Sequence, residues 1–197
     1  MTHRLPFQTM LRNGERVLIR EVGPADRPLL REGFAKLSDQ SRFFRFLAPH
    51  RKLSEAELDR FCKENTDEHF AIGALSTGVE ADMPIATARF VRVTEGAEEA
   101  EIALTIIDSH QRLGLGSLLM RTLAEVAVSR GITAFTALLH HDNEGMQGLL
   151  KRFGGQRVSE GLEAEWILPL PLPEKNKKTR SRPACDILIP PPPKPGL

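Results

Sequence analysis

Two glycines, Gly114 and Gly116, lie between a stretch with the pattern of a β-strand and one with the pattern of an amphipathic helix. Backbone N–H groups at a helix start lack an intrahelical partner, and the helix dipole places roughly half a positive charge there. Glycine allows a ligand to approach the backbone closely, and Arg112 can add a charge-assisted hydrogen bond. The arrangement favours binding of a phosphate group. Tight packing of the helix on the strand is the alternative explanation of the glycines.

Two familiar phosphate-binding motifs do not fit this turn. A dinucleotide-binding fingerprint requires a third glycine at the position that Leu119 occupies here. A P-loop requires Gly-Lys followed by Ser or Thr, and the sequence has no such tripeptide. The turn is therefore predicted to bind a phosphate of another kind of ligand.

Glu101 is the first candidate for acid–base chemistry. It alternates along its strand with apolar residues and shares a face with Ala103 and Thr105. A carboxylate beside small side chains is expected to face a cleft rather than the core. Glu99 points to the same face and is the fallback candidate. The alternative is that Glu101 is an ordinary solvated acid next to an acid-rich turn.

The histidines and cysteines show no arrangement typical of a metal centre. His110, His140 and His141 are candidates for proton transfer, although histidines in loops are commonly polar surface residues. Neither they nor Cys62 and Cys185 have the spacing of metal ligands. No metal site is predicted, and two unrelated cysteines are typical of a reduced cytoplasmic protein.

Hydrophobic periodicity predicts the elements that position these residues. Strands are expected over 16–20, 69–75, 84–93, 101–107 and 134–139, with a closing hairpin over 156–159 and 162–168. Helices are expected over 24–37, 54–62, 113–129 and 143–153, and 38–46 is a short helix or a turn. The strand–helix–strand order places the fourth and fifth strands parallel to each other.

Composition bounds the domain organisation and the partners. A chain of 197 residues with 41% hydrophobic residues accommodates one globular domain. We expect an extended leader over 1–14, the domain over 15–169 and a proline-rich, disordered tail over 170–197. A net charge of +1 argues against nucleic acid as the main partner. No apolar run approaches a membrane span, so a cytoplasmic monomer or homodimer without membrane contact is predicted.

The run Ala100–Ile107, followed by Gln111–Leu119, resembles motif A of the GNAT N-acetyltransferases, whose pattern is Gln/Arg-x-x-Gly-x-Gly/Ala after the fourth strand. Downstream, Asp142–Met146 and Leu149–Gly154 are similar to the family's next helix. The resemblance covers about 16–168. It implies an α/β (α+β) GNAT fold: a mixed, mostly antiparallel sheet that splays between its fourth and fifth strands, with helices on both faces.

The resemblance also implies acetyl-CoA as the acyl donor and assigns residues to it. Its pyrophosphate is expected on the turn and first helical residues, which are Gln111, Arg112, Leu113, Gly114, Leu115, Gly116 and Ser117. Its pantetheine arm is expected to lie like an added strand along Thr105, Ile106 and Ile107. Asn143 and Met146 are expected as further contacts.

The acceptor amine must lose a proton, since a lysine amine has a pKa near ~10.4. In protein-acetylating GNAT enzymes a glutamate near the start of the fourth strand accepts it, and Glu101 matches that position. Many members also use a tyrosine to protonate the departing thiolate. The sequence has no tyrosine, and Leu150 stands at the matching position. Solvent or another group must serve, or the thiolate leaves unaided because its pKa is low.

The segment Leu37–Phe46 resembles one found in Pat-type bacterial protein lysine acetyltransferases, which implies a protein lysine as acceptor. Packing of its three phenylalanines against the sheet is the alternative role for that segment. Two further functions stay open from the sequence. One is acetylation of a small-molecule amine, and the other is a non-catalytic acyl-CoA sensor.

Overall fold

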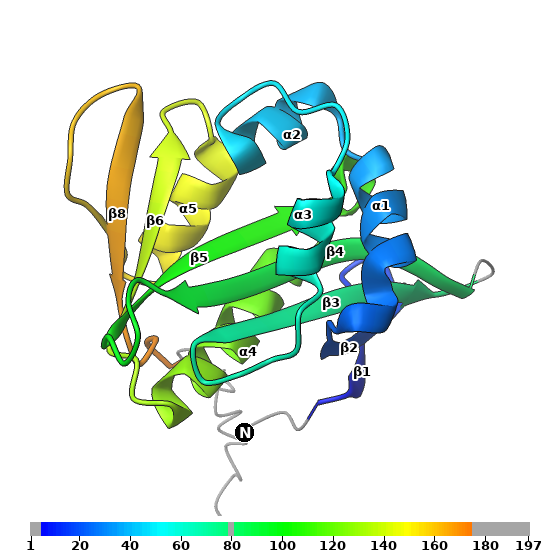
Figure 1. The fold of residues 1–197 in the computed structure, drawn as a ribbon, viewed down its shortest axis with the longest axis horizontal. Helices are drawn as coiled ribbons and strands as arrows, with labels where there is room; N and C mark the ends of the chain where they lie inside the picture. The colour runs from blue at the N-terminus through cyan, green and yellow to red at the C-terminus, as the bar shows by residue number, and fades with distance from the viewer. Residues whose placement is uncertain (1–4, 79–80, 175–197) are drawn as a thin grey trace, which may run out of the picture.

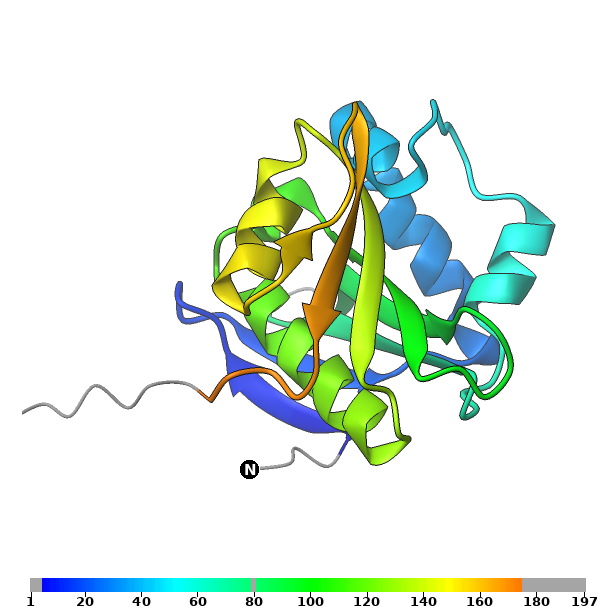
Figure 2. The same ribbon diagram turned by 90° about the vertical axis from the view of Figure 1, so that its left-hand side faces the viewer.

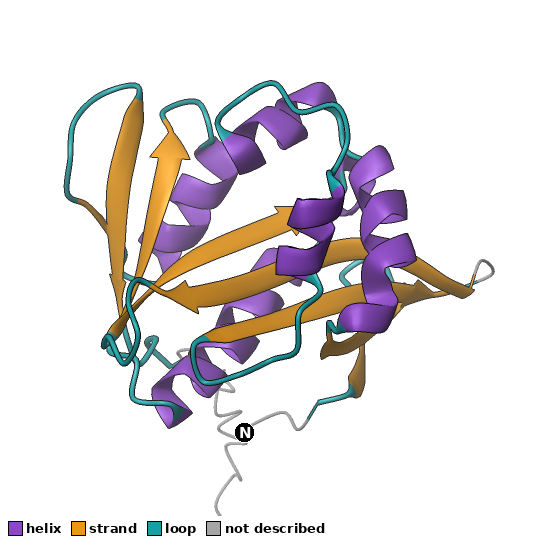
Figure 3. Cartoon of the chain, viewed as in Figure 1, coloured by secondary structure: helices purple, strands orange, loops and turns teal. Residues whose placement is uncertain are grey.

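The structure, a computed structural model, describes residues 5–78 and 81–174 and consists of one twisted sheet with helices on both faces (Figures 1 and 3). The strands lie in the order β1-β2-β3-β4-β5-β6-β8-β7. Every neighbouring pair is antiparallel except β5 and β6, which are parallel. The strands are β1 (Phe7–Met10), β2 (Arg16–Glu21), β3 (His69–Thr77), β4 (Ala81–Arg92), β5 (Glu99–Ile106), β6 (Ala134–His140), β7 (Gln156–Arg157) and β8 (Glu163–Pro169).

In the described part of the chain, five α-helices and two short 3-10 turns complete the fold and confirm the expected fold class. The helices are α1 (Arg27–Ala35), α2 (Asp39–Phe46), α3 (Glu55–Phe61), α4 (Leu115–Ser129) and α5 (Glu144–Arg152), and the turns are η1 (Pro24–Asp26) and η2 (Asp108–His110). Helices α1 and α3 lie on one face of the sheet, and α4 and α5 lie on the other (Figures 1 and 2).

Local side-chain chemistry explains where two of the helices begin. Ser54 and Glu57 form the expected capping box: each side chain accepts a hydrogen bond from the other's backbone N–H, at 3.3 and 2.8 Å. Ser38 caps α2 by accepting a hydrogen bond from the N–H of Ser41 at 3.2 Å. The segment 38–46, which was expected to form either a short helix or a turn, therefore forms a helix.

The main core lies between the sheet and α4. Leu119 and Leu123 of α4 are fully buried, as the amphipathic pattern predicts, and they share one apolar cluster with Phe90 of β4 and Phe135 of β6. Burying a large apolar side chain contributes about 1.5–3 kcal/mol. This packing fixes α4, and with it the glycine turn at its start.

The two ends of the domain differ from the sequence prediction. The expected leader contributes β1, an edge strand in which Phe7 pairs with Ile19 and Met10 with Arg16. Strands of four residues carry little periodicity, and this one depends on β2 for its hydrogen bonds. Because β1 precedes the strands expected from the sequence, the expected fourth strand (101–107) is β5 and the expected fifth strand (134–139) is β6.

At the other end, the first residues of the expected tail lie along α4. The Leu170 N–H donates to the Thr133 carbonyl at 2.8 Å, and Arg121 donates to the Pro173 carbonyl at 3.0 Å. The polyproline stretch belongs to 175–197 and lies outside the described residues. Within the described residues, no helix has the length and apolar character needed to cross a membrane.

His69 predicts a pH dependence of stability. Its side chain is buried at the start of β3, and burial, with the charge of Arg89 adding, lowers the pKa of His69 to about 4. The unfolded chain binds this proton near pH 6.5. The contribution of neutral His69 to the free energy of unfolding is therefore fully present above pH 6.5 and is lost as the pH falls towards 4. At pH 5 the loss is about 2 kcal/mol.

Urea unfolding at pH 7.5 and pH 5.0 measures this loss. His69→Leu, which cannot titrate, is expected to lose about 2 kcal/mol less than the wild type between the two pH values. An equal loss in both proteins would contradict the assignment to His69.

Candidate active site

The parallel strands β5 and β6 form a fork. They pair over three residues only, Glu99 with Ala134, Ala100 with Phe135 and Glu101 with Thr136, and separate beyond Glu101 (Figure 1). Each strand keeps its other neighbour: β5 stays paired with β4 as far as Ile106, and β6 with β8 as far as His140. Among residues 5–78 and 81–174, no strand therefore lies beside the separated part of β5 or β6 on the side that faces the gap.

The open edge of β5 has hydrogen-bonding groups that face the gap. The Ile107 N–H donates to the Ile85 carbonyl of β4 at 2.9 Å. Because successive residues of an antiparallel strand direct their N–H and C=O groups to opposite sides, Leu104 and Ile106 direct theirs away from β4. Of the residues expected to bind the pantetheine arm, Ile106 therefore faces the gap and Thr105 faces β4, and Leu104 also faces the gap. The Ile107 N–H is already engaged.

Glu101 lies at the point where the fork opens. It is exposed, whereas its neighbours Ala100 and Ile102 are buried on the opposite face. The register places Glu101 beside Val91 and Thr105 beside Thr87, so the face that Glu101 shares with Ala103 and Thr105 is the one covered by α1 and α3. The face assignment made from alternation is confirmed.

The glycine turn has backbone geometry suited to an anion. Gly114 has φ of 93° and caps α4, and Arg112 has φ of 61°, a region in which non-glycine residues are uncommon. A Cβ on Gly116 would lie 3.4 Å from Ile106 and 3.5 Å from Leu149, which are tolerable contacts. Packing inside the domain therefore does not require glycine at position 116. At position 114, the positive φ angle of the backbone favours glycine.

Three arginines lie in or beside this turn, and two of them come from distant segments. Arg112 is exposed within it, and Arg152 of α5 donates to the Ser117 hydroxyl at 3.1 Å. Arg12, from the loop between β1 and β2, donates its N–H to the Leu113 carbonyl at 3.3 Å, and its side chain borders Gly114. Nothing in the local sequence around Arg12 or Arg152 predicts that either residue lies beside the turn.

Several expected cofactor contacts have structural roles of their own. Leu115 and Met146 are buried in the core, and Asn143 caps α5 by accepting the Met146 N–H at 3.1 Å. Gln111 donates its side-chain amide to the Ile106 carbonyl at 3.2 Å and to the Ser41 hydroxyl at 3.3 Å. Gln111 therefore joins α2 to the open edge of β5.

Helix α2 bridges the ends of the two diverging strands. Beyond β5, Asp108 accepts hydrogen bonds from the Ser38 N–H at 2.9 Å and from the hydroxyls of Ser38 and Ser41, both at 2.8 Å. At the end of β6, the His140 ring lies 5.3 Å from the Phe43 ring and 6.1 Å from the Phe44 ring, between centroids. The helix therefore closes the wide end of the fork on the Glu101 face.

The three histidines do not gather into one site. His110 is buried beside Glu15, with its Nε2 3.2 Å from Glu15 Oε1. His140 and His141 lie with Asp142 after β6, where the His141 Nε2 is 3.0 Å from Asp142 Oδ1. Of the three, His140 alone contacts α2 through ring packing.

The family model of the acetyltransferase (GNAT) family matches residues 35–155, a span that includes the fork, the glycine turn and α5. The chain belongs to the GNAT acetyltransferase family. Members of this family are acyl-CoA-dependent N-acetyltransferases, which use acetyl-CoA as acyl donor and an amine as acceptor.

Relatives of this GNAT domain include two bacterial acetyltransferases. It is 32% identical to acetyltransferase Pat of Mycolicibacterium smegmatis over 157 residues, 80% of this chain and 46% of Pat. It is 34% identical to acetyltransferase PA5475 of Pseudomonas aeruginosa over 151 residues, 75% of this chain and 80% of that protein. The chain thus spans less than half the length of Pat.

Among solved structures, the GNAT domain of S. lividans PAT superposes with a TM-score of 0.76 at 28% identity, covering 84% of this chain and 97% of that domain. A cAMP-binding acyltransferase from Mycobacterium smegmatis superposes with a TM-score of 0.59 at 30% identity, covering 83% of this chain and 47% of that protein. The expected resemblance to the catalytic domain of Pat-type acetyltransferases is confirmed.

The residues of this GNAT domain fit the family's donor. A left-handed Gly114 orients the amides at the start of α4 outward, and Arg12, Arg112 and Arg152 place positive charge around them. A pyrophosphate group is negatively charged, and arginines together with the amides of a helix start bind negatively charged groups. The open edge of β5 offers N–H and C=O groups for an amide-containing arm.

Asp108→Asn is expected to loosen α2 over the acceptor side of the fork. Burial raises the pKa of Asp108, but the hydrogen bonds from Ser38 and Ser41 outweigh burial and leave it below its ordinary value. Replacing the carboxylate removes charge-assisted bonds worth about 1.5–3 kcal/mol. The KM for the amine acceptor should rise about fivefold, with little change in the KM for acetyl-CoA.

Steady-state kinetics with each substrate varied in turn measures both constants. Asp39→Asn is the matched control, because Asp39 lies on α2, the helix that Asp108 anchors, and its side chain is fully exposed. An equal rise in acceptor KM for both variants would contradict the anchoring role of Asp108.

Proposed function

We propose that this domain transfers the acetyl group of acetyl-CoA to the side-chain amine of a protein lysine, with Glu101 as general base. The observation that carries the proposal is the position of Glu101, an exposed carboxylate at the last paired residue of the fork. Its side chain lies on the face of the sheet that α1 and α3 cover, opposite the face that α4 covers, so the amine is proposed to approach from the α1 and α3 side.

The residues of the domain divide the reaction between them. The lysine amine arrives protonated, and Glu101 accepts its proton directly or through a water molecule. Acetyl-CoA supplies an activated acyl carbon and a thiolate leaving group. Leu150 is buried in the core, so α5 offers no acid at the usual tyrosine position. Thiols have low pKa values, and protonation by solvent completes the exchange.

The lysine acceptor is supported by two similarities. The segment Leu37–Phe46 matches the pattern of Pat-type enzymes, and it forms α2 at the acceptor side of the fork. Sequence similarity to Pat extends over 80% of this chain.

The test is acetyl transfer by the wild-type protein. CoA thiol release is followed with acetyl-CoA and a panel of lysine-containing proteins, lysine peptides and small amines, and products are located by mass spectrometry. Acetyl-lysine in a protein or peptide is the expected product. Turnover with small amines alone would overturn the lysine assignment. Tight binding of acetyl-CoA without turnover on any acceptor would overturn catalysis and favour a sensor.

A further inference from the structure

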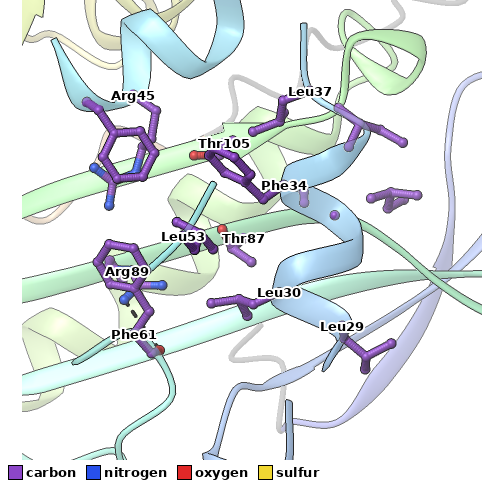
Figure 4. Close-up of a pocket in the computed structure, with 15 residues that line it drawn as sticks. Leu29, Leu30, Phe34, Leu37, Arg45, Leu53, Phe61, Thr87, Arg89 and Thr105 are labelled. Carbon is purple, nitrogen blue, oxygen red and sulfur yellow. Dashed lines mark hydrogen bonds between the residues drawn. The ribbon is translucent and has the colours of Figure 1, made fainter. Parts of the chain in front are cut away.

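A small cavity of about 60 Å³ lies between the sheet and helices α1, α2 and α3 (Figure 4). Its walls are mostly apolar and include Leu30, Phe34 and Leu53. Two arginines, Arg45 of α2 and Arg89 of β4, interrupt this lining near Phe61 (Figure 4). The cavity therefore combines walls that suit hydrocarbon with two cationic groups.

Arg89 is almost completely buried without a carboxylate partner. It is 6% exposed, its Nη1 donates to the Phe61 carbonyl at 3.3 Å, and its guanidinium lies 4.2 Å from the centroid of the Phe61 ring. Within the described residues, no carboxylate is in ion-pair distance of Arg89. A guanidinium has five N–H donors, and buried charges in proteins are ordinarily paired. Arg89 thus retains donors for a ligand.

Arg45 brings a second positive charge to the same place. Its guanidinium lies 5.1 Å from the centroid of the Phe46 ring and 5.5 Å from that of the Phe61 ring. Burial lowers the pKa of both arginines, and the charge of Arg45 further lowers the pKa of Arg89, to about 9. Desolvation and mutual repulsion both cost free energy. An anion held between the two guanidinium groups would offset both costs.

The cavity is next to the proposed base. Arg89 pairs with Ala103 of β5, two residues along the strand from Glu101, which corresponds to about 7 Å. Glu101 is also the carboxylate whose charge acts most on Arg45. A group bound at the two arginines would therefore lie within reach of an amine acceptor positioned at the proposed base.

We propose that Arg45 and Arg89 form an anion subsite for the acceptor, which selects lysines that have a glutamate side chain close to them in the polypeptide. This inference rests on the proposed function, because it concerns the same acceptor. The methylene groups of a glutamate match the apolar walls, and its carboxylate matches the guanidinium pair. Helix α2 supplies Arg45, so the position of α2 also determines the subsite.

The test compares lysine peptides that differ only by glutamate or glutamine at positions flanking the lysine. The wild type is expected to have a kcat/KM about tenfold higher for the best glutamate peptide than for its glutamine counterpart. Arg45→Gln and Arg89→Gln should reduce this ratio to about one. Arg60→Gln should keep it, since Arg60 stacks on the same Phe61 ring but is exposed and does not line the cavity.

Arg89 is buried, so thermal unfolding must show that its variant is folded. If Arg89→Gln does not fold, the ratio of kcat/KM for the two peptides is measured with Arg45→Gln, whose position on α2 is half-buried. Equal acetylation of both peptides by the wild type would overturn the subsite and leave lysine acetylation intact. Free amino acids outcompeting every peptide would overturn the polypeptide occupant. Acetylation of no lysine in any peptide or in the lysine-containing proteins would instead overturn the proposed function.

Discussion

Glu101→Gln is expected to lower the kcat of acetyl transfer by about 100-fold at neutral pH, because general-base catalysis contributes about 10²–10⁴-fold. Glutamine has the same shape but cannot accept the proton of the amine. The KM for acetyl-CoA should change little, since the glycine turn lies at the other end of β5. Loss of kcat with an unchanged donor KM is the signature of an interaction made in the transition state.

Glu99→Gln is the matched control for this variant. Glu99 is exposed on the same strand and the same face, but it pairs with Ala134 in the closed part of the fork. Its kcat should stay within about twofold of the wild type. The rate deficit of Glu101→Gln should also shrink as pH rises, since more of the amine is then already deprotonated. A large loss in Glu99→Gln with a normal Glu101→Gln would transfer the role of base to Glu99.

Gly114→Ala is expected to raise the KM for acetyl-CoA by about 10- to 100-fold, which corresponds to losing one charge-assisted hydrogen bond of about 1.5–3 kcal/mol. Gly114 has φ of 93°, where an alanine is strained by about 1–2 kcal/mol. The three atoms nearest to a Cβ there belong to the flexible Arg12 side chain, at 3.5 Å or more, so backbone strain is the main expected effect. A turn that relaxes out of this conformation no longer directs its amides at the pyrophosphate.

Gly131→Ala is the matched control, because it introduces similar backbone strain at a glycine that is far from the predicted donor-binding turn. Gly131 has φ of 77° just beyond the C-terminal end of the same helix, and a Cβ there has open space around it. Both variants should lose similar stability in urea unfolding, and only Gly114→Ala should lose affinity for acetyl-CoA. Donor binding is measured by calorimetry and by the steady-state KM. An unchanged affinity in Gly114→Ala would mean that the turn does not bind the donor's phosphates.

Some features of the site could be predicted from local sequence alone. The apolar period of α4 predicts its buried face, and Leu119 and Leu123 are buried as expected. Ser54 and Glu57 predict the start of α3, because a capping box needs only residues three apart. Alternation along β5 predicts the face of Glu101, since successive strand residues point to opposite sides.

Other features depend on contacts between distant segments. The edge strand Phe7–Met10 exists because β2 offers it hydrogen bonds, and four residues carry too little pattern to reveal it. Arg12 and Arg152 reach the glycine turn from opposite ends of the chain. The burial of Met146 could not be told from its position after Asn143.

The sequence by itself determined the order of the elements from β2 onward, the family resemblance and the place of the glycine turn. These features are set by short-range geometry, in which each residue acts through its near neighbours. Only the tertiary structure decided that the fork opens at Glu101 and that Arg45 and Arg89 meet in one cavity. Which side chains meet across the sheet depends on strand register and helix packing, and these are settled by long-range burial of the core.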